Sequence, residues 1–173
     1  MNYAAIRHYD IANGEGVRTS LFVSGCYFHC PECFNPEQQD FDYGQPLDLP
    51  TCANIINSVR EDVIAGLSLL GGDPLCQDED GLARLIALCM HVHILHKTVW
   101  LWSGYTWEQV FADCSNELLT LRQDLVRNSD VFVDGTFQKE FADRALKWRG
   151  SANQRVIDVK TTLQQEKIIL YEG

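Results

Sequence analysis

Short apolar segments alternate with helical patterns along this chain, and this alternation limits the folds it can adopt more than any other feature. Strands are expected at residues 21–23, 67–70, 99–102 and 131–133, with a fifth candidate at 156–159. The first four end in turns of small or polar residues, such as Ser103-Gly104. This order of elements is typical of βαβ units, which build a parallel sheet.

The segments between these strands carry the periodicity and the capping residues of helices. Helices are expected over residues 51–63, 82–89 and 118–126, and from residue 106 onward. Asp78 or Asp80 can cap the second of them, because a carboxylate before the first turn accepts free backbone N–H groups. Thr106 and Gln109 have the spacing of a capping box.

A parallel sheet would gather the reactive groups of this chain at one edge. The groups that follow expected strands are a cysteine cluster, Gly71-Gly72-Asp73, Ser103-Gly104 and Asp134-Gly135. Reactive groups of such sheets lie beyond the carboxyl ends of the strands. A closed eight-stranded barrel needs about 250 residues, and this chain has 173. We therefore expect an α/β fold, a partial and open (β/α) barrel of roughly five or six βα units, as a single domain over residues 1–173.

The cysteine cluster has the pattern Cys26-x3-Cys30-x2-Cys33. A [4Fe–4S] cluster is normally held by thiolates, one for each iron, so three cysteines leave one iron free to bind another ligand. A zinc site completed by His29, Cys52 or a distant residue is the main alternative. A chance run of structural thiols is a second one.

Composition argues against a nucleic-acid-binding protein, a membrane protein and a disulfide-stabilised protein. The formal net charge is −10, whereas a nucleic-acid-binding protein needs a basic face. The sequence shows no signal peptide and no apolar run long enough for a membrane span, so a cytoplasmic location is expected. The chain has seven cysteines, an odd number, which favours reduced thiols over a disulfide framework.

The other four cysteines are expected to have no role in chemistry. Cys52 and Cys89 fall within expected helices and Cys114 near a helix end, where a free thiol usually packs as a small apolar group. Cys76 follows the glycine turn and could approach the reactive edge, although packing is the more usual use of such a thiol.

Together, several motifs resemble the radical S-adenosylmethionine enzymes and, among them, the family of activating proteins of anaerobic ribonucleoside-triphosphate reductase. The matching segments are Asn13-Gly14-x-Gly16-x-Arg18, Leu21-Phe22-Val23-Ser24-Gly25-Cys26, Cys30-Pro31-x-Cys33-x-Asn35, Leu69-x-Gly71-Gly72-Asp73-Pro74-Leu75, Trp102-x-Gly104-Tyr105, Val133-Asp134-Gly135-x-Phe137 and Trp148-Arg149-Gly150-Ser151-x-Asn153-Gln154. They extend over nearly the whole chain.

This resemblance implies an oxidoreductase with a [4Fe–4S] cluster held by Cys26, Cys30 and Cys33. The reduced cluster would cleave S-adenosylmethionine, and the resulting 5′-deoxyadenosyl radical would generate a glycyl radical on the catalytic subunit of the reductase. Reduced flavodoxin or ferredoxin would supply the electron. The alternatives are an activase of pyruvate formate-lyase or another small radical enzyme, and a non-catalytic iron–sulfur or zinc module.

The resemblance also marks cofactor contacts, while no residue beyond the cluster and the cofactor is expected to be catalytic. Gly71, Gly72 and Asp73 match the motif that meets the methionine amino group, and Ser103 and Asp134 are further candidates at strand ends. Each of the five can instead be an ordinary turn or cap residue. On the cofactor interpretation, Gly72→Val should weaken S-adenosylmethionine binding and spare the cluster.

Two residues depart from the pattern of the family, and two segments are candidates for the partner surface. Glu15 stands where proline is expected. Glu32 stands where glycine or an aromatic residue is expected, so Phe28, His29 or a later residue would have to stack on adenine. The segments are residues 13–18 and 148–154, with Arg149 as the best single docking candidate because guanidinium suits charged and carbonyl acceptors.

Overall fold

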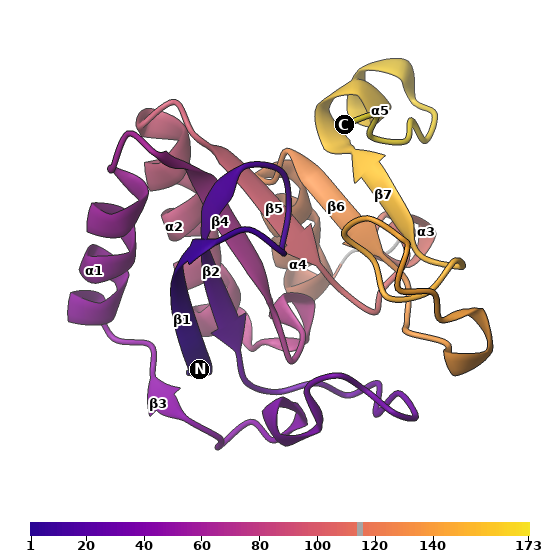
Figure 1. Cartoon of the computed structure of the whole chain (residues 1–173), viewed down its shortest axis with the longest axis horizontal. Coiled ribbons are helices and arrows are strands. Elements are labelled where there is room, and N and C mark those ends of the chain that lie inside the picture. Colours follow the sequence, from indigo (N-terminus) through magenta and orange to yellow (C-terminus); the bar gives the residue numbers. More distant parts are fainter. Residues whose placement is uncertain (114–115) are drawn as a thin grey trace.

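The computed structural model describes residues 1–113 and 116–173, and Cys114 lies outside them. One seven-stranded sheet runs through the molecule in the order β3-β1-β2-β4-β5-β6-β7 (Figure 1). The strands are β1 (Asn2–Asp10), β2 (Val17–Val23), β3 (Gln45–Pro46), β4 (Ile64–Gly71), β5 (Thr98–Trp102), β6 (Val131–Asp134) and β7 (Arg155–Asp158). The helices are α1 (Leu49–Val59), α2 (Glu79–Ile94), α3 (Trp107–Val110), α4 (Glu117–Arg127) and α5 (Val159–Gln165), with short 3-10 turns η1 (Pro36–Gln39), η2 (Pro74–Cys76) and η3 (Lys139–Phe141).

The centre of the sheet is parallel, as the sequence predicts. Strands β2, β4, β5 and β6 pair in parallel, with Val23 opposite Gly71 and Trp102 opposite Val133. Their carboxyl ends therefore lie along one edge. Strands β1 and β3 on one side and β7 on the other run antiparallel to their neighbours.

The expected number of five or six βα units is not confirmed: in the described part of the chain, four strands pair in parallel. Strand β7 pairs antiparallel with β6. Residues 135–154, which join these two strands, contain the short turn η3 and no α-helix. A parallel return needs a crossover connection, usually a helix, so the chain re-enters the sheet in the opposite direction.

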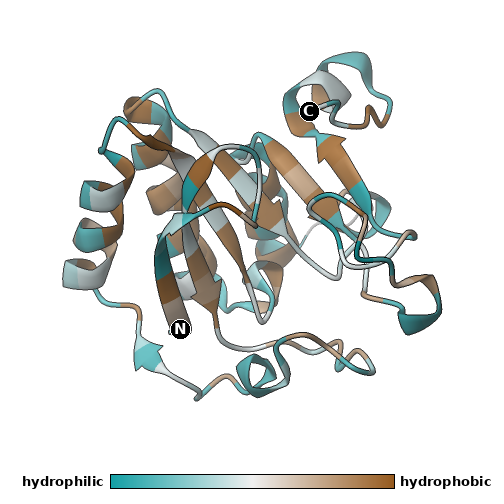
Figure 2. Ribbon diagram, in the orientation of Figure 1, coloured by the Kyte–Doolittle hydropathy of each residue, from teal (hydrophilic) through white to brown (hydrophobic). Residues whose placement is uncertain are grey.

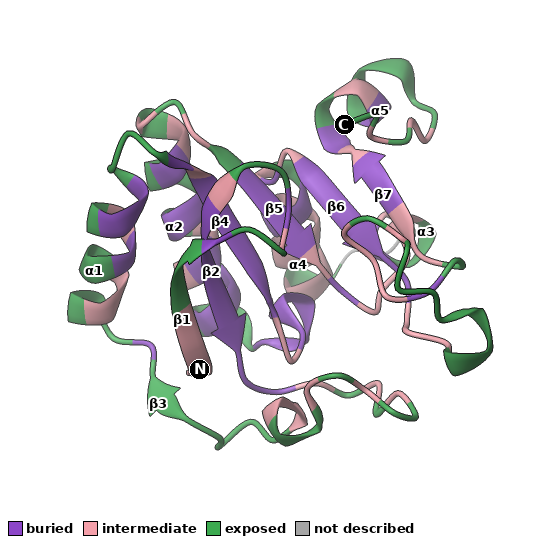
Figure 3. Ribbon diagram, in the orientation of Figure 1, coloured by how far each residue is buried: buried purple, intermediate pink, exposed green. Residues whose placement is uncertain are grey.

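Helices α1, α2 and α4 cover one face of the sheet (Figure 1). The central strands β2, β4, β5 and β6 are mostly apolar, and most of their residues are buried (Figures 2 and 3). Helix α2 carries Asp78 as its N-cap and buries Leu82, Leu85 and Cys89, as its periodicity predicts. Helix α1 ends at Val59 rather than Val63, whose side chain is 58% exposed.

The loop between β1 and β2 folds across the other face of the sheet, where Figure 1 shows it in front of β4 and β5. Ser68 Oγ on β4 donates a 2.6 Å hydrogen bond to the carbonyl of Asn13. Arg18 is buried beneath this loop and donates five hydrogen bonds, to Glu15, Leu67, Ser68 and Thr98. Arg18 therefore ties β2, β4 and β5 together.

The capping box predicted at Thr106 is present. The Thr106 side chain accepts from the Gln109 amide, and the Gln109 side chain accepts from the Thr106 amide. Helices of the described residues include none that is both long and apolar enough to cross a membrane.

Candidate functional site

A cavity of about 390 Å³ lies where the four parallel strands end. It is lined by Cys26, Phe28, Cys30 and Cys33 after β2, by residues 71–73 after β4, by residues 102–104 around the end of β5, and by residues 135–137 after β6. Ala12 and Asn13 from the β1–β2 loop, residues 148–150, and Phe34, Asn35, Leu70, Leu146 and Gln154 also line it. The structure thus brings together the three predicted ligands and most of the predicted cofactor contacts.

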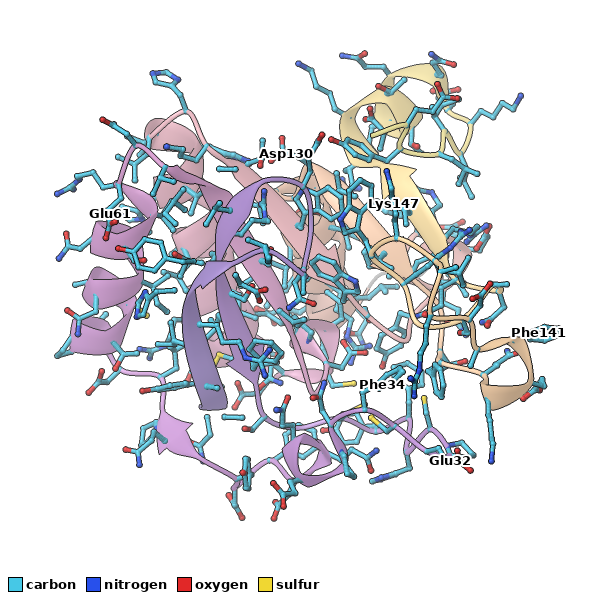
Figure 4. All side chains as sticks on the ribbon, in the orientation of Figure 1. Glu32, Phe34, Glu61, Asp130, Phe141 and Lys147 are labelled. Atoms are coloured by element: carbon cyan, nitrogen blue, oxygen red, sulfur yellow. The ribbon has the colours of Figure 1, made fainter. Side chains whose placement is uncertain are left out.

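The cysteine loop presents its three sulfurs to this cavity. Cys26, Cys30 and Cys33 are free thiols of intermediate burial. The amides of Phe28 and Asn35 donate 3.4 Å hydrogen bonds to the sulfurs of Cys26 and Cys33. Figure 4 shows sulfur atoms beside the labelled Phe34 in this loop. Amide hydrogen bonds to sulfur stabilise thiolates and tune iron–sulfur clusters, so these residues fit the predicted cluster.

The pKa values of the Cys26 and Cys30 thiols are shifted in opposite directions. Burial raises the pKa of the Cys30 thiol. A hydrogen bond from the side chain of Cys76 lowers the pKa of Cys26, and the amide of Phe28 adds to that effect.

The donor set does not fit the zinc alternative. His29 is exposed, its Nδ1 lies 2.9 Å from Gln39 Oε1, and it does not line the cavity. Cys52 is on α1, beside a different pocket. Among the described lining residues there is no histidine and no fourth cysteine. A structural zinc site usually has four protein ligands, whereas three thiolates suit a cluster with one free iron.

Gly71 and Gly72 hold the second wall of the cavity against the cysteine loop. Gly71 has a φ of +111°, which favours glycine. A Cβ on Gly72 would lie 2.6 Å from the carbonyl oxygen of Gly25 and 2.5 Å from that of Gln38. The close backbone approach that needs glycine is therefore made to the residue before Cys26. Contact with a cofactor remains a prediction.

Asp73 links the ends of β4 and β5 rather than pointing freely into the cavity. Its carboxylate accepts hydrogen bonds from Ser103 Oγ at 2.9 Å, from the Gly104 amide at 2.8 Å and from the Leu75 amide at 2.8 Å. Burial raises the pKa of Asp73 to about 6, and these donors act in the opposite direction. Asp73 thus caps η2, and Ser103 is held by the same carboxylate.

Comparison with known proteins agrees with this geometry. Residues 12–157 match the family described as "4Fe-4S single cluster domain". The chain is 40% identical to the anaerobic ribonucleoside-triphosphate reductase-activating protein of Pasteurella multocida over 158 residues, 89% of this chain and 95% of the relative. Proteins of the same name are 36% identical in Escherichia coli K12, over 90% of this chain and 97% of the relative, and 32% identical in Enterobacteria phage T4, over 90% and 93%.

The chain belongs to this family of reductase-activating proteins. The resemblance inferred from the motifs is confirmed, and so is the expected iron–sulfur cluster, through the matched cluster domain. The individual site residues remain predictions.

Of the five predicted cofactor contacts, Asp134 is the one that does not line the cavity. Its side chain is buried, accepts from the Trp107 amide at 2.7 Å, and pairs with Arg155 at 2.5 Å. Arg155 also binds Glu108 and lowers the pKa of Glu108 to about 2. These contacts tie β6 to β7 and α3, beside a second pocket that adjoins the first through Phe28 and Gly104.

Three further residues help to build the site. Asn35 Nδ2 donates a 3.5 Å hydrogen bond to the carbonyl of Gly71, which joins the two walls. Gln154 accepts from the Gly150 amide and donates to the carbonyl of Gly135. Asn35 and Gln154 belong to the motifs quoted above, so the signal was present in the sequence. Cys76, expected to pack, lies beside Cys26.

Glu32, which departs from the pattern of the family, has a role on the surface of the cysteine loop. It has a φ of +56°, where glycine is favoured, and its carboxylate forms an exposed ion pair with Lys139. Figure 4 places it at the outer end of the cysteine loop. Glu32 therefore joins this loop to η3 instead of contacting the cavity.

Proposed function

We propose that this protein is an iron–sulfur radical S-adenosylmethionine enzyme that activates an anaerobic ribonucleoside-triphosphate reductase. The observation that carries the proposal is a cavity at the strand ends with the thiols of Cys26, Cys30 and Cys33 on one wall and the Gly71-Gly72 turn on the other. When bound and reduced, the cluster would supply one electron to cleave S-adenosylmethionine, and the 5′-deoxyadenosyl radical would take a hydrogen atom from a glycine of the reductase.

The residues of the chain would bind and orient these groups. Cys26, Cys30 and Cys33 would each hold one iron, and the fourth iron would take the amino and carboxylate groups of S-adenosylmethionine. Gly71 and Gly72 would keep the facing wall close to the cluster, and Asp73 would fix Ser103 and Gly104 on the same wall. Four parallel strands with an open carboxyl edge support a partial (β/α) barrel of the radical S-adenosylmethionine type.

We also propose that the chain forms one domain over residues 1–173, that it works in the cytoplasm, and that reduced flavodoxin or ferredoxin supplies its electron. The single continuous sheet supports the first of these.

Phe28 is the best candidate to stack on the adenine. It lines both adjoining cavities, and it packs edge-on against Tyr105 with ring centroids 4.9 Å apart. Phe28→Ala should raise the dissociation constant for S-adenosylmethionine roughly tenfold, because one base–aromatic stack contributes about 1–3 kcal/mol. Iron content should not change. Equilibrium binding to the reconstituted protein measures this.

Tyr27→Ala is the matched control for Phe28. Tyr27 is 63% exposed and does not line the cavity that holds the cysteines. If Phe28→Ala and Tyr27→Ala bind S-adenosylmethionine with the same affinity, Phe28 does not stack on the adenine.

Arg149 is proposed to meet the glycine-bearing loop of the reductase. It lines the cavity, and its Nη1 donates a 2.8 Å hydrogen bond to the carbonyl of Gln154. Arg149→Ala should lower the yield of glycyl radical on the reductase several-fold, while S-adenosylmethionine cleavage without the reductase persists. Electron paramagnetic resonance of the mixture measures the yield.

Lys147→Ala is the control for Arg149, since Lys147 is exposed, near in sequence and not among the residues that line the cavity. A wild-type yield in Arg149→Ala would place the docking surface elsewhere. A parallel fall in cofactor affinity would instead assign Arg149 to the cofactor.

The proposed function is tested by anaerobic reconstitution. The protein should turn brown with ~4 iron atoms per chain and should release 5′-deoxyadenosine from S-adenosylmethionine under a strong reductant. Mixing with anaerobic ribonucleotide reductase should then give a glycyl radical. A radical on pyruvate formate-lyase instead would select the other activase, and stoichiometric zinc without sulfide or cleavage would select a non-catalytic module.

A further inference from the structure

Two sulfurs that the proposed reaction does not pair lie against each other beside the cavity. The sulfurs of Cys26 and Cys76 and a carboxylate oxygen of Asp73 all lie within 4.8 Å of one another. Cys26 lines the cavity, whereas the side chain of Cys76 is only 1% exposed. The Cys26 thiol can therefore be reached from the cavity, whereas Cys76 is almost fully buried and borders a different pocket, beside Tyr27 and Arg122.

The backbone holds these two thiols in place. The Gly72 amide donates to the carbonyl of Val23, and the Asp73 amide donates to the carbonyl of Gly25, both at 2.8 Å. The Cys76 amide donates in turn to the carbonyl of Asp73 at 3.1 Å. The loop that carries Cys76 is thus fixed to the residue that precedes Cys26, so the fold itself keeps the two sulfurs within 4.8 Å of each other.

The third member of the group does not make it a separate metal site. Both carboxylate oxygens of Asp73 already accept hydrogen bonds, from Ser103 Oγ and from the amides of Leu75 and Gly104. A metal ligand at Asp73 would have to give up these contacts in a buried position, which is costly. The chemistry that remains is that of two adjacent thiols.

We propose that Cys26 and Cys76 form a thiol–disulfide exchange pair in the chain before its cluster is inserted or after the cluster is lost. The Cys26 thiolate attacks a small-molecule disulfide and releases its first half as a thiol. The Cys76 sulfur then attacks the mixed disulfide, forms the Cys26–Cys76 bond and releases the second half. Two protein thiols are oxidised by two electrons, and the disulfide is reduced to two thiols, which carry the two protons.

This exchange would protect a cluster ligand. A thiol that stands open to a cavity can be oxidised irreversibly to the sulfinic or sulfonic acid, whereas a disulfide is returned to the thiols by reduction. The bridge would also keep Cys26 from binding iron until a dithiol reduces it. This last consequence rests on the proposed ligand role of Cys26, but the formation of the bridge does not.

The test uses the full-length, cluster-free chain, reduced and then treated anaerobically with oxidised glutathione. Peptide mapping by mass spectrometry without reduction should find the Cys26–Cys76 bridge as the main product in the wild type. In Cys76→Ser the second step is blocked, so glutathione should remain attached at Cys26. Cys89→Ser, a change at another buried thiol, should behave as the wild type.

Iron uptake supplies a second readout. The bridged wild-type protein should fail to take up iron and sulfide until a dithiol is added. A main bridge from Cys26 to Cys30 or Cys33, or the absence of a stable adduct in Cys76→Ser, would overturn the proposal. The peptide maps need no cluster, no S-adenosylmethionine and no reductase, so they are independent of the proposed function, whereas the iron readout also rests on the ligand role of Cys26.

Discussion

Replacing any one of Cys26, Cys30 or Cys33 with alanine is expected to abolish the stable cluster. Each thiolate is proposed to hold one iron, and the described residues that line the cavity include no fourth cysteine or histidine. Cys76, which lies outside this lining but within 4.8 Å of Cys26, is tested separately below. Iron and sulfide analysis after anaerobic reconstitution should fall from ~4 iron atoms per chain in the wild type to background in each variant.

Cleavage of S-adenosylmethionine should disappear with the cluster, while the fold persists. The three side chains are only of intermediate burial and lie on a loop outside the sheet and the helices, so their loss removes little core packing. Circular dichroism spectra should therefore resemble that of the wild type. Cys52→Ala is the matched control, because Cys52 is also half-buried but lies on α1 beside another pocket.

Cys76 requires one additional variant. Because its sulfur lies within 4.8 Å of that of Cys26, it could supply a thiolate when Cys26 is removed. The Cys26→Ala change is therefore made with and without Cys76→Ser. Iron content that survives in Cys26→Ala and is lost in the double variant would show replacement by Cys76. A full cluster in the double variant would mean that Cys26 is not a ligand.

The central sheet could be predicted because its strands are locally encoded. Strands β4, β5 and β6 and residues 21–23 of β2 are mostly apolar runs bounded by turns, and most of their residues are buried. The first part of β2 contains Arg18, Thr19 and Ser20, so the apolar pattern does not reveal it. Strand β1 was missed because its nine residues include Arg7, His8 and Asp10 and most of its side chains remain partly or fully exposed. The direction of β7 was not visible, since pairing direction is decided by the connection and not by the strand.

The site also has features that could be predicted from the sequence and features that could not. The three cysteines of the loop are close in sequence, so their shared position could be inferred from spacing. The Asp134–Arg155 pair joins β6 to β7, where these two residues lie opposite each other, and this register depends on the direction of β7. The approach of Cys76 to Cys26 likewise depends on hydrogen bonds between two loops that are distant in sequence.

Gly72→Val is expected to impair both the fold and the cluster, a larger effect than the sequence alone predicts. A Cβ at Gly72 would lie 2.5–2.9 Å from the backbone of Gln38 and Gly25, and backbone atoms cannot rotate away as a side chain can. The cysteine loop must therefore shift at the residue before Cys26. Overpacking of this kind costs about 1–3 kcal/mol, so the melting temperature should fall by several degrees.

Iron uptake distinguishes this expectation from a role of Gly72 in cofactor binding alone. If the cysteine loop shifts, Gly72→Val should take up much less iron than the wild type, and Gly72→Ala should show a smaller loss in the same direction. Gly150→Ala is the matched control at the same cavity, because its Cβ would meet only side-chain atoms of Phe34 and Phe137, at 3.0 Å or more, and those rings can move. If Gly72→Val has full iron content but binds S-adenosylmethionine weakly, the role of Gly72 is in cofactor binding. If its iron content and its S-adenosylmethionine binding both match the wild type, Gly72 is an ordinary turn residue.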